Sequence, residues 1–522
     1  MQKEININKP RVFAMASNIC LASLYFGYNI STYNSVSQVI ISLNGWRGTD
    51  KETLYPSLIT SSLAAGCIIS APVAVNVLKI FKNNLRRASM LLDLLTIIAC
   101  IVQLVDTHVA NLMIGRFIAG MIIGLNCTYV SSFVAEVSPT QLRGITGCIN
   151  QLLVCFGICV VFLLGLSLPS KQNLIDDPTY DNQVNWRIVV GFPVIFTILR
   201  FINFVLFFRY DTPCELYKQG KIKELQSFLR TIYRDESEID IQVNLIKEQV
   251  NATSSSNNKI DTEKAKSNSQ NVNPATNSEI SSETKHQKND KNATSDLHEH
   301  SEENDYAKKS FNRRWLLGLL MCIGQQLTCI NGVNFYSNQI FEDANQADNA
   351  YYYSIGLGFI QFFACLVSVF IVDKKGRRPM MLWGTVLLVI SLALIAILLS
   401  LDLFIPSFLA ICLFLIAFSL SQGPLVWAYQ GEMLEQKALQ INTCVLWIFT
   451  LVIGIIFPYM AQGIKAGGTF AIFAAITFIF LIYYKKEFIE TKGKSRVEIY
   501  RDFCDQIFVK QKEIKQEQIN AA

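Results

Sequence analysis

The stretch GRFIAGMIIGLNCTYVSSFVAEVSPTQLRG, from Gly115 to Gly144, decides the fold class. It belongs to an apolar run over 112–135 whose single charged residue is Arg116, and charges return after the run as Glu136 and Arg143. A helix needs about 20 mostly apolar residues to cross the hydrocarbon core of a bilayer. The run is long enough, so the sequence predicts a membrane-spanning helix here.

Similar runs recur along the whole chain of 522 residues, which is 51% hydrophobic and only 17% charged. The first run should remain as an uncleaved helix, because it is too long for a secretory signal. The predicted spans are 11–33, 56–80, 87–106, 112–135, 146–168, 187–208, 315–342, 352–372, 379–400, 405–430, 439–463 and 467–484. Twelve spans predict an all-α, multi-pass membrane protein.

The basic residues of the short loops predict the orientation of these spans. Lys and Arg cluster between spans 2 and 3 and between spans 8 and 9, whereas the opposite loops are poorer in them. Because basic loops stay on the cytosolic side, both termini should be cytosolic. The net charge of +5 then fits loops held at an anionic inner leaflet and indicates no nucleic-acid partner.

A change of composition divides the spans into six and six. Residues 250–310 are rich in Asn, Ser, Lys, Glu and Thr, which predicts a disordered linker. Before it, residues such as Leu225, Phe228 and Leu229 recur at helical spacing and predict short amphipathic helices. The expected organisation is a cytosolic N-terminus (1–10), a six-helix half (11–209), cytosolic amphipathic helices (210–249), the linker (250–310), a second six-helix half (311–486) and a cytosolic tail (487–522).

Five motifs give the chain a family resemblance. The opening stretch resembles the sugar porter signature of the major facilitator superfamily, and DKKGRRPMM, GQQLTCINGVNFYS, GPLVWAYQGE and IETKGKS resemble four more motifs, each in the half where the family has it. The resemblance implies the major facilitator fold and sugar transport by alternating access. It implies neither an enzyme nor a cofactor. With four His residues and no CxxC spacing, the sequence also offers no credible catalytic triad or metal site.

Charged residues near the ends of the spans are expected to form a cytosolic gate. In the family such groups pair across helix ends when this gate is shut. The candidates are Arg86, Arg87, Arg116, Glu136 and Arg143 in the first half, and Arg377, Arg378 and Glu432 in the second. The segment after Glu432 looks about one helical turn short and replaces the family's arginine with Lys437. A looser gate is therefore predicted in the second half.

The amides of GQQLTCINGVNFYS are expected to face a sugar. Amides donate and accept hydrogen bonds at once, which suits hydroxyl groups, and aromatic rings suit the apolar faces of a sugar. A helix break near Cys329 to Gly332 would turn Asn331 toward the cavity. The resemblance implies substrate contacts at Gln151, Gln325, Gln326, Asn331, Gln361, Phe418, Trp427 and Trp447, and an extracellular gate at Tyr336. The alternative is that the amides only bond neighbouring helices.

Some sugar contacts of the family are replaced, which leaves the identity of the sugar open. Ser419 stands where glucose carriers often have Glu, and Leu446 stands where they have Asn. Gln361 likewise replaces an Asn often found in span 8.

Asn29 occupies the position at which proton-coupled sugar porters typically have Asp. An amide cannot carry a proton through a transport cycle, so facilitated diffusion of a hexose such as glucose is expected. The other acid deep in the first half is Asp93, and the depth of Arg200 predicts that these two form a buried pair.

Three alternatives stay open: a proton-coupled symporter, a non-transporting sugar sensor, and a carrier of another polyol or organic solute. The sequence leaves the oligomeric state undetermined, and we expect a functional monomer. The plasma membrane is the expected location, with an organelle membrane as the alternative.

Overall fold

The computed structural model describes residues 6–139, 142–169, 174, 183–247, 250, 291–343, 349–494 and 498–505. These residues are almost entirely helical, and the one β-bridge among them joins Ile7 to Tyr233. The helices are α1 (Lys9–Leu43), α2 (Lys51–Ser70), α3 (Ala74–Ile80), α4 (Leu85–Val105), α5 (Val109–Val137), α6 (Arg143–Gly165), α8 (Gln183–Gly191), α9 (Val194–Leu206), α10 (Pro213–Lys218), α11 (Ile222–Ile232), α13 (Lys291–Gln326), α14 (Ile330–Asp343), α15 (Ala350–Lys375), α16 (Arg377–Ser400), α17 (Phe404–Leu420), α18 (Gln422–Met433) and α19 (Gln436–Glu487).

These helices account for twelve spans. By length and composition, ten helices in the described residues are apolar enough to cross a membrane. The last of them covers Lys437–Glu487 and supplies two spans, because the backbone of α19 breaks at Lys465 (φ 60°, ψ 164°). The twelfth span is α1, which buries polar and apolar residues together.

Several spans are broken helices. Span 6 is divided between α8 and α9 by Pro193, whose ring cannot continue a helix. Span 7 is divided between α13 and α14, and span 10 between α17 and α18 at Ser421. Such interruptions are tolerated at membrane depth only where protein or a cavity covers the freed backbone groups.

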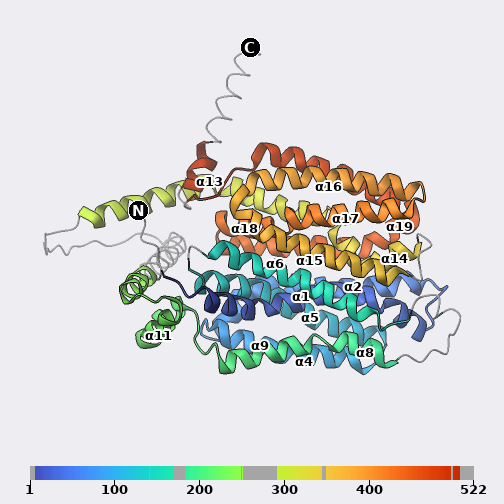
Figure 1. Cartoon of the computed structure of the whole chain (residues 1–522), viewed down its shortest axis with the longest axis horizontal. Helices are drawn as coiled ribbons and strands as arrows, with labels where there is room; N and C mark the ends of the chain where they lie inside the picture. The colour runs from blue at the N-terminus through green and yellow to red at the C-terminus, as the bar shows by residue number, and fades with distance from the viewer. Residues whose placement is uncertain are drawn as a thin grey trace, which may run out of the picture.

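The two halves form two layers that lie side by side (Figure 1). The layers meet where α6 packs on α15, α2 on α19 and α1 on α14. Within the first half, Gly27 of α1 and Gly157 of α6 let the two backbones touch, since a Cβ at either position would collide with the opposite main chain. This close packing holds α1 and α6 together as two walls of the interior.

Two boundary predictions need correction. The first span was predicted to end at residue 33, but α1 continues to Leu43 because its polar residues are satisfied by α14. The linker was predicted to be disordered over 250–310, but α13 begins at Lys291, and Tyr306 and Ser310 near the membrane end contact Arg501 and Arg314. Residues 251–290 lie outside the described part of the chain.

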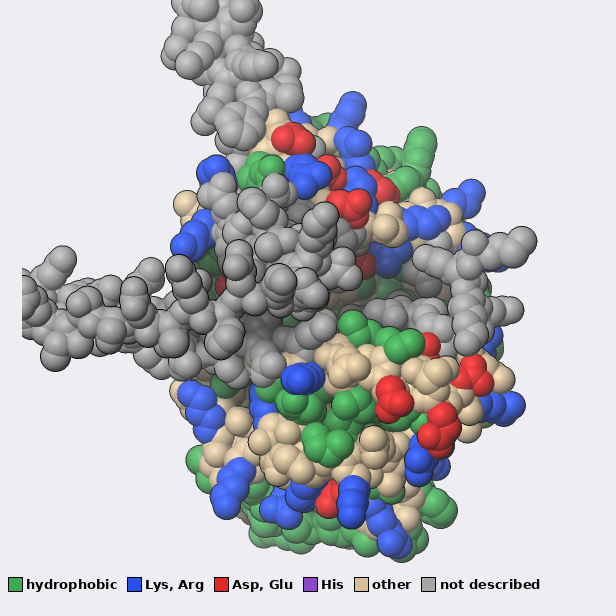
Figure 2. Space-filling model, turned by 90° about the vertical axis from the view of Figure 1, so that its left-hand side faces the viewer, with side chains coloured by type: hydrophobic (Ala, Val, Ile, Leu, Met, Phe, Trp, Pro, Cys, Tyr) green, Lys and Arg blue, Asp and Glu red, His purple; other side chains and the backbone are tan. Residues whose placement is uncertain are grey.

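The end predicted to be cytosolic carries α10, α11 and the start of α13. In α11 the side chains of Leu225, Phe228 and Leu229 are buried, as their helical spacing predicts. Figure 2 looks onto this end and shows Lys and Arg side chains, interspersed with Asp and Glu, on both layers, and a patch of apolar side chains on the lower layer. This distribution agrees with the orientation inferred from the basic loops.

Candidate functional site

A cavity of about 60 Å³ lies between the two halves. Its lining comes from six of the spans and includes all eight residues that were predicted to contact the substrate. The lining residues are Phe26, Ile30, Gln151, Val154, Ile158, Gln325, Gln326, Ile330, Asn331, Asn334, Gln361, Phe418, Trp427, Leu446, Trp447 and Thr450. The structure thus brings together residues from 26 to 450, which only the fold places side by side.

The predicted helix break in span 7 is confirmed. Helix α13 ends at Gln326, α14 begins at Ile330, and Cys329 between them has a positive φ of 69°. The break turns Asn331 toward Gln326, and its Nδ2 donates to the Gln326 Oε1 at 2.5 Å. An inward-facing amide pair results.

Sequence reasoning missed Thr450, which joins this amide pair from α19. Its hydroxyl lies 3.1 Å from the Gln326 Oε1 and 3.4 Å from the Asn331 Nδ2. A signal was available, because Thr450 follows Trp447 by three residues and therefore lies on the same helix face.

Gln325 has a structural task as well as a place in the cavity wall. Its Nε2 donates to the carbonyl of Gln422 at 2.9 Å, immediately after the break between α17 and α18. This hydrogen bond ties α13 to the first turn of α18. Gln325 therefore bonds a neighbouring helix in addition to lining the cavity.

The aromatic side of the cavity contains an unused donor. Trp447 packs edge-to-face on Phe26, with ring centroids 5.3 Å apart. Its indole Nε1 is buried and has no hydrogen-bond partner among the described residues. Buried polar groups are nearly always paired, so this N–H is suited to bind a polar group in the cavity.

The assignment of Arg116 to the cytosolic gate is wrong. Arg116 lies in the second turn of α5, and the 20 residues to Glu136 correspond to about 30 Å at 1.5 Å per residue. Its guanidinium is buried at the opposite end of the span and donates to the carbonyls of Ile59 at 2.9 Å and Asn29 at 3.3 Å. The Arg116 Cζ also lies over the aromatic ring of Tyr33, 5.7 Å from the ring centroid.

Asn29 therefore lies beside a buried positive charge. Its own Nδ2 donates to the carbonyl of Tyr25 at 3.0 Å. In the described part of the chain, Arg116 makes no salt bridge. A buried guanidinium is ordinarily paired with a carboxylate. Around Arg116, the carbonyl oxygens of Ile59 and Asn29 and the ring of Tyr33 take that place.

The predicted pair of Asp93 and Arg200 is confirmed. The Arg200 Nε lies 3.0 Å and 3.1 Å from the two oxygens of Asp93, and both side chains are buried. Arg200 also donates to the carbonyl of Ser89 at 3.2 Å. The pair joins α4 to α9 inside the first half and does not line the central cavity.

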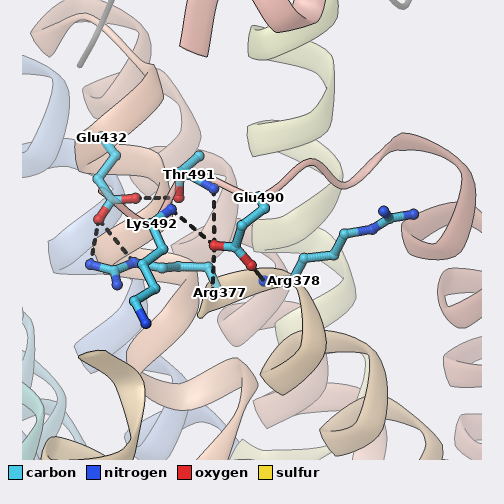
Figure 3. A network of polar contacts seen from close by, with 6 residues as sticks. All are labelled: Arg377, Arg378, Glu432, Glu490, Thr491 and Lys492. Atoms are coloured by element: carbon cyan, nitrogen blue, oxygen red, sulfur yellow. Dashed lines mark hydrogen bonds and ion pairs between the residues drawn. The ribbon is translucent and has the colours of Figure 1, made fainter. Parts of the chain in front are cut away.

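The cytosolic charges of the second half form a connected network (Figure 3). Arg377 donates to the Glu432 carboxylate at 2.9 Å, and the Thr491 hydroxyl donates to the other oxygen at 2.5 Å. The Glu490 carboxylate accepts from the backbone N–H groups of Arg377 at 2.9 Å and Arg378 at 3.0 Å, which caps α16. Partial burial acts to raise the pKa of Glu490, but these and neighbouring N–H donors outweigh it and lower the pKa.

The first half has a different arrangement at the corresponding place. Arg86 donates through its side chain to the carbonyl of Phe204 at 2.7 Å, and its backbone N–H donates to Asp211 at 3.4 Å. Glu136 interacts with Thr212, Cys214 and Lys218. Arg87 is exposed, and the side chain of Arg143 lies outside the described part. These contacts do not support the prediction of a looser gate in the second half.

Tyr336, the predicted extracellular gate, lies in the middle of α14, where the helix is kinked (φ −134°, ψ 19°). Its hydroxyl donates to the carbonyl of Gly454 at 2.5 Å, and its ring stacks on Phe457 with centroids 5.6 Å apart. Next to it, a second cavity of about 620 Å³ opens between α1, α2, α14 and α19, on the side that the basic loops predict to be extracellular. Tyr336 thus forms part of the floor of this cavity.

Known proteins resemble the chain over nearly its whole length. The Plasmodium falciparum (isolate 3D7) protein "Hexose transporter 1" is 25% identical over 504 residues, with 92% of this chain and 90% of that protein covered. The Staphylococcus epidermidis "Glucose transporter GlcP" is also 25% identical, with 94% and 96% covered. Among solved structures, the proton:xylose symporter XylE bound to 6-bromo-6-deoxy-D-glucose superposes with a TM-score of 0.71 at 20% identity and covers 95% of this chain and 100% of that one.

The profile of the family described as "Sugar (and other) transporter" matches residues 15–278 and 259–503. Together these matches span nearly all of the two six-helix halves, in the major facilitator arrangement that the XylE fold shares. The chain therefore belongs to the sugar (and other) transporter family, whose members are membrane carriers and not enzymes.

Proposed function

We propose that the chain carries a hexose such as glucose across the membrane by facilitated diffusion, with the two halves rocking about the central cavity. The observation that carries this proposal is the chemistry of the cavity wall. Amides, a hydroxyl and aromatic rings line it, and no acidic or basic residue is among the described lining. A neutral polyol suits such a wall, because a charged ligand would lose its hydration without gaining a counter-charge.

Individual groups of the wall match the hydroxyls of a sugar. The network of Gln326, Asn331 and Thr450 offers donors and acceptors together. The free Trp447 N–H adds one directed donor beside an aromatic face. The relatives named as hexose and glucose transporters support the same substrate class.

The surroundings of Asn29 favour uniport. A proton-coupled carrier needs a group that gains and loses a proton during the cycle, and an amide cannot do so. Here Arg116 donates to the backbone carbonyls of Ile59 and Asn29, and the Asn29 side chain donates to the carbonyl of Tyr25. No step of the proposed cycle therefore requires a proton.

The deciding experiment is uptake of radiolabelled hexoses into proteoliposomes, with and without an inward pH gradient. Uniport predicts uptake that stops at equal concentrations and does not respond to the gradient. Asn331→Ala should raise the KM, whereas the lipid-facing variant Trp383→Ala, at a side chain that is 71% exposed, should leave it unchanged. Absence of uptake for every hexose would contradict transport and favour a sensor.

Proton symport is the second candidate, because Asp93 is a buried carboxylate in the first half. The same assay separates it from uniport. Symport predicts accumulation above equilibrium that follows the pH gradient and disappears in Asp93→Asn.

The plasma membrane is the proposed location, and the monomer is the proposed functional unit. All described residues of the central cavity come from one chain, so a single copy can supply the site. A fluorescent fusion imaged with membrane markers tests the location, and the mass of the detergent-solubilised protein tests the oligomeric state.

A further inference from the structure

Two cysteines meet where the two halves of the chain touch. Cys155 lies on α6 of the first half and Cys365 lies on α15 of the second, and both side chains are buried. Their thiols are in hydrogen-bonding contact. Helices α6 and α15 pack on each other along the boundary between the halves, so this thiol pair crosses that boundary. Both cysteines are free in this structure.

The contacts between α6 and α15 follow the order expected of two antiparallel helices. A Cβ added to Gly358 would lie 3.1 Å from the Cα of Cys159. Next along α6, the rings of Phe156 and Phe362 have centroids 5.5 Å apart. The contact of Cys155 with Cys365 continues this series. The missing side chain at Gly358 lets the two backbones approach closely, which favours a disulfide, because its Cα atoms must lie within about 7 Å.

Gln151 prepares one of the two sulfurs for reaction. Its Nε2 donates to the Cys155 Sγ at 3.7 Å, from one turn earlier on α6. The thiolate, rather than the thiol, is the nucleophilic form of cysteine. A hydrogen-bond donor beside the sulfur stabilises negative charge as it develops there. Cys155 is therefore favoured as the sulfur that reacts first.

The central cavity gives a small oxidant access to this pair. Gln151 lines the cavity from α6, and Gln361 lines it from α15. The cavity measures about 60 Å³, whereas one water molecule needs roughly 10–15 Å³. Hydrogen peroxide is uncharged and carries two hydroxyl groups, so it suits a wall of amides. It can reach the Gln151 amide and the Cys155 sulfur bonded to that amide.

We propose that hydrogen peroxide oxidises Cys155 and Cys365 to a disulfide that locks the two halves together. The Cys155 sulfur attacks one peroxide oxygen, the O–O bond breaks, and the other oxygen leaves as water with the thiol proton. The Cys365 sulfur then attacks the resulting sulfenic acid at sulfur, and a second water leaves. Two electrons pass from sulfur to oxygen, so two thiols and one peroxide give one disulfide and two waters.

The effect of this bond on transport rests on the proposed rocking of the two halves. An S–S bond of about 2.05 Å holds α6 against α15 in the arrangement seen here. Helix α6 cannot yield within its own half, because the backbone of Val154 packs against Gly27 of α1. Oxidised chains therefore stop carrying hexose, and reduction of the disulfide restores transport.

The disulfide can be detected without measuring transport, because the linker lies between the two cysteines. A protease site inserted within residues 251–290 allows the purified full-length chain to be cut between the halves after treatment with hydrogen peroxide. Non-reducing electrophoresis should then show the halves still joined, and dithiothreitol should separate them. Cys155→Ser and Cys365→Ser should each abolish the joining. Cys159→Ser is the matched control and should leave the joining unchanged, because Cys159 lies one turn away on α6 and faces Gly358.

Uptake into proteoliposomes tests the lock itself. Hexose uptake by the native chain should fall in proportion to the joined fraction and recover with dithiothreitol. Cys155→Ser and Cys365→Ser should keep their own uptake after peroxide treatment, since neither residue lines the central cavity. Size-exclusion profiles establish that each variant is folded, and Cys155→Ala replaces Cys155→Ser if the latter aggregates.

Three results would overturn the proposal. The halves of the native chain could separate after peroxide treatment, or joined chains could carry hexose at the native rate. The halves could also stay joined in Cys155→Ser and separate in Cys148→Ser, which would assign the bond to Cys148, two turns away on α6. A reduced native chain that takes up no hexose contradicts the transport proposal alone, because electrophoresis still reports the disulfide.

Discussion

The buried pair of Asp93 and Arg200 gives the sharpest prediction. The two side chains are only 6% and 2% exposed, and the Nε to Oδ1 distance is 3.0 Å. In Asp93→Asn, the guanidinium stays buried with the Ser89 carbonyl and the Asn126 amide oxygen, 3.2 Å and 3.5 Å away, as its remaining acceptors. Breaking a buried pair by removing one partner costs about 3–5 kcal/mol, because an uncompensated charge remains.

A double-mutant cycle measures this coupling. Asp93→Asn and Arg200→Gln should each lower the melting temperature in detergent strongly, and the double variant should lose much less than the sum of the two. Uptake per folded molecule should persist in the double variant, because neither residue lines the central cavity.

Two results would refute the reasoning. If Asp93→Asn is as stable as the native chain, the pair does not hold α4 and α9 together. If the double variant is stable but has lost a proton-driven accumulation that the native chain shows, Asp93 carries protons and the uniport proposal fails.

Other predictions concern the two ends of the carrier and its walls. Burial raises the pKa of Asp211 to about 6, although the backbone N–H groups of Thr212 and Arg86 lower it in part. The folded state therefore binds a proton more tightly than the unfolded state does. As a result, the free energy of unfolding falls as the pH rises from about 4 to about 6. Asp211→Asn should therefore raise the free energy of unfolding at pH 7.5 by about 2–3 kcal/mol, seen as a higher melting temperature, and change it little at pH 4. An equal shift at both pH values would contradict the raised pKa of Asp211 as the cause. Glu432→Gln weakens the contacts with Arg377 and Thr491 and should slow uptake at least as much as Glu136→Gln does. The sequence alone predicted the opposite order. If Glu432→Gln has the milder effect in parallel uptake assays, the network in Figure 3 does not act as a gate. Gln325→Ala should lower the melting temperature by removing about 1 kcal/mol of bonding to the span 10 backbone, whereas Asn331→Ala should mainly raise the KM; equal KM effects would show that both amides bind substrate. Gly27→Val should abolish folded protein in size-exclusion chromatography, because its side chain would meet the Val154 backbone, and a monodisperse variant would disprove that contact.

Local patterns were enough to predict the spans and the wall of span 7. Apolar runs of bilayer length identified the twelve crossings, and the amides beside Cys329 indicated the break that turns Asn331 inward. The break at Ser421 was missed, because the contact beside it, from Gln325 to the Gln422 carbonyl, joins residues almost a hundred positions apart in the sequence. The outer part of α1 was missed for the same reason, because Asn34 is polar in the sequence but bonds to Ser337 and Asn338 in the fold.

The misplacement of Arg116 has a different cause, because the sequence did contain the information. A rise of about 1.5 Å per residue correctly put Asp93 and Arg200 at one depth. The same rise, counted along 112–135, puts Arg116 and Glu136 at opposite ends of one helix. A buried charge at the outer end must be satisfied within the first half, and α1 supplies the carbonyl of Asn29 to do so. The residue expected to close the cytosolic side therefore contacts the position that distinguishes uniport from symport.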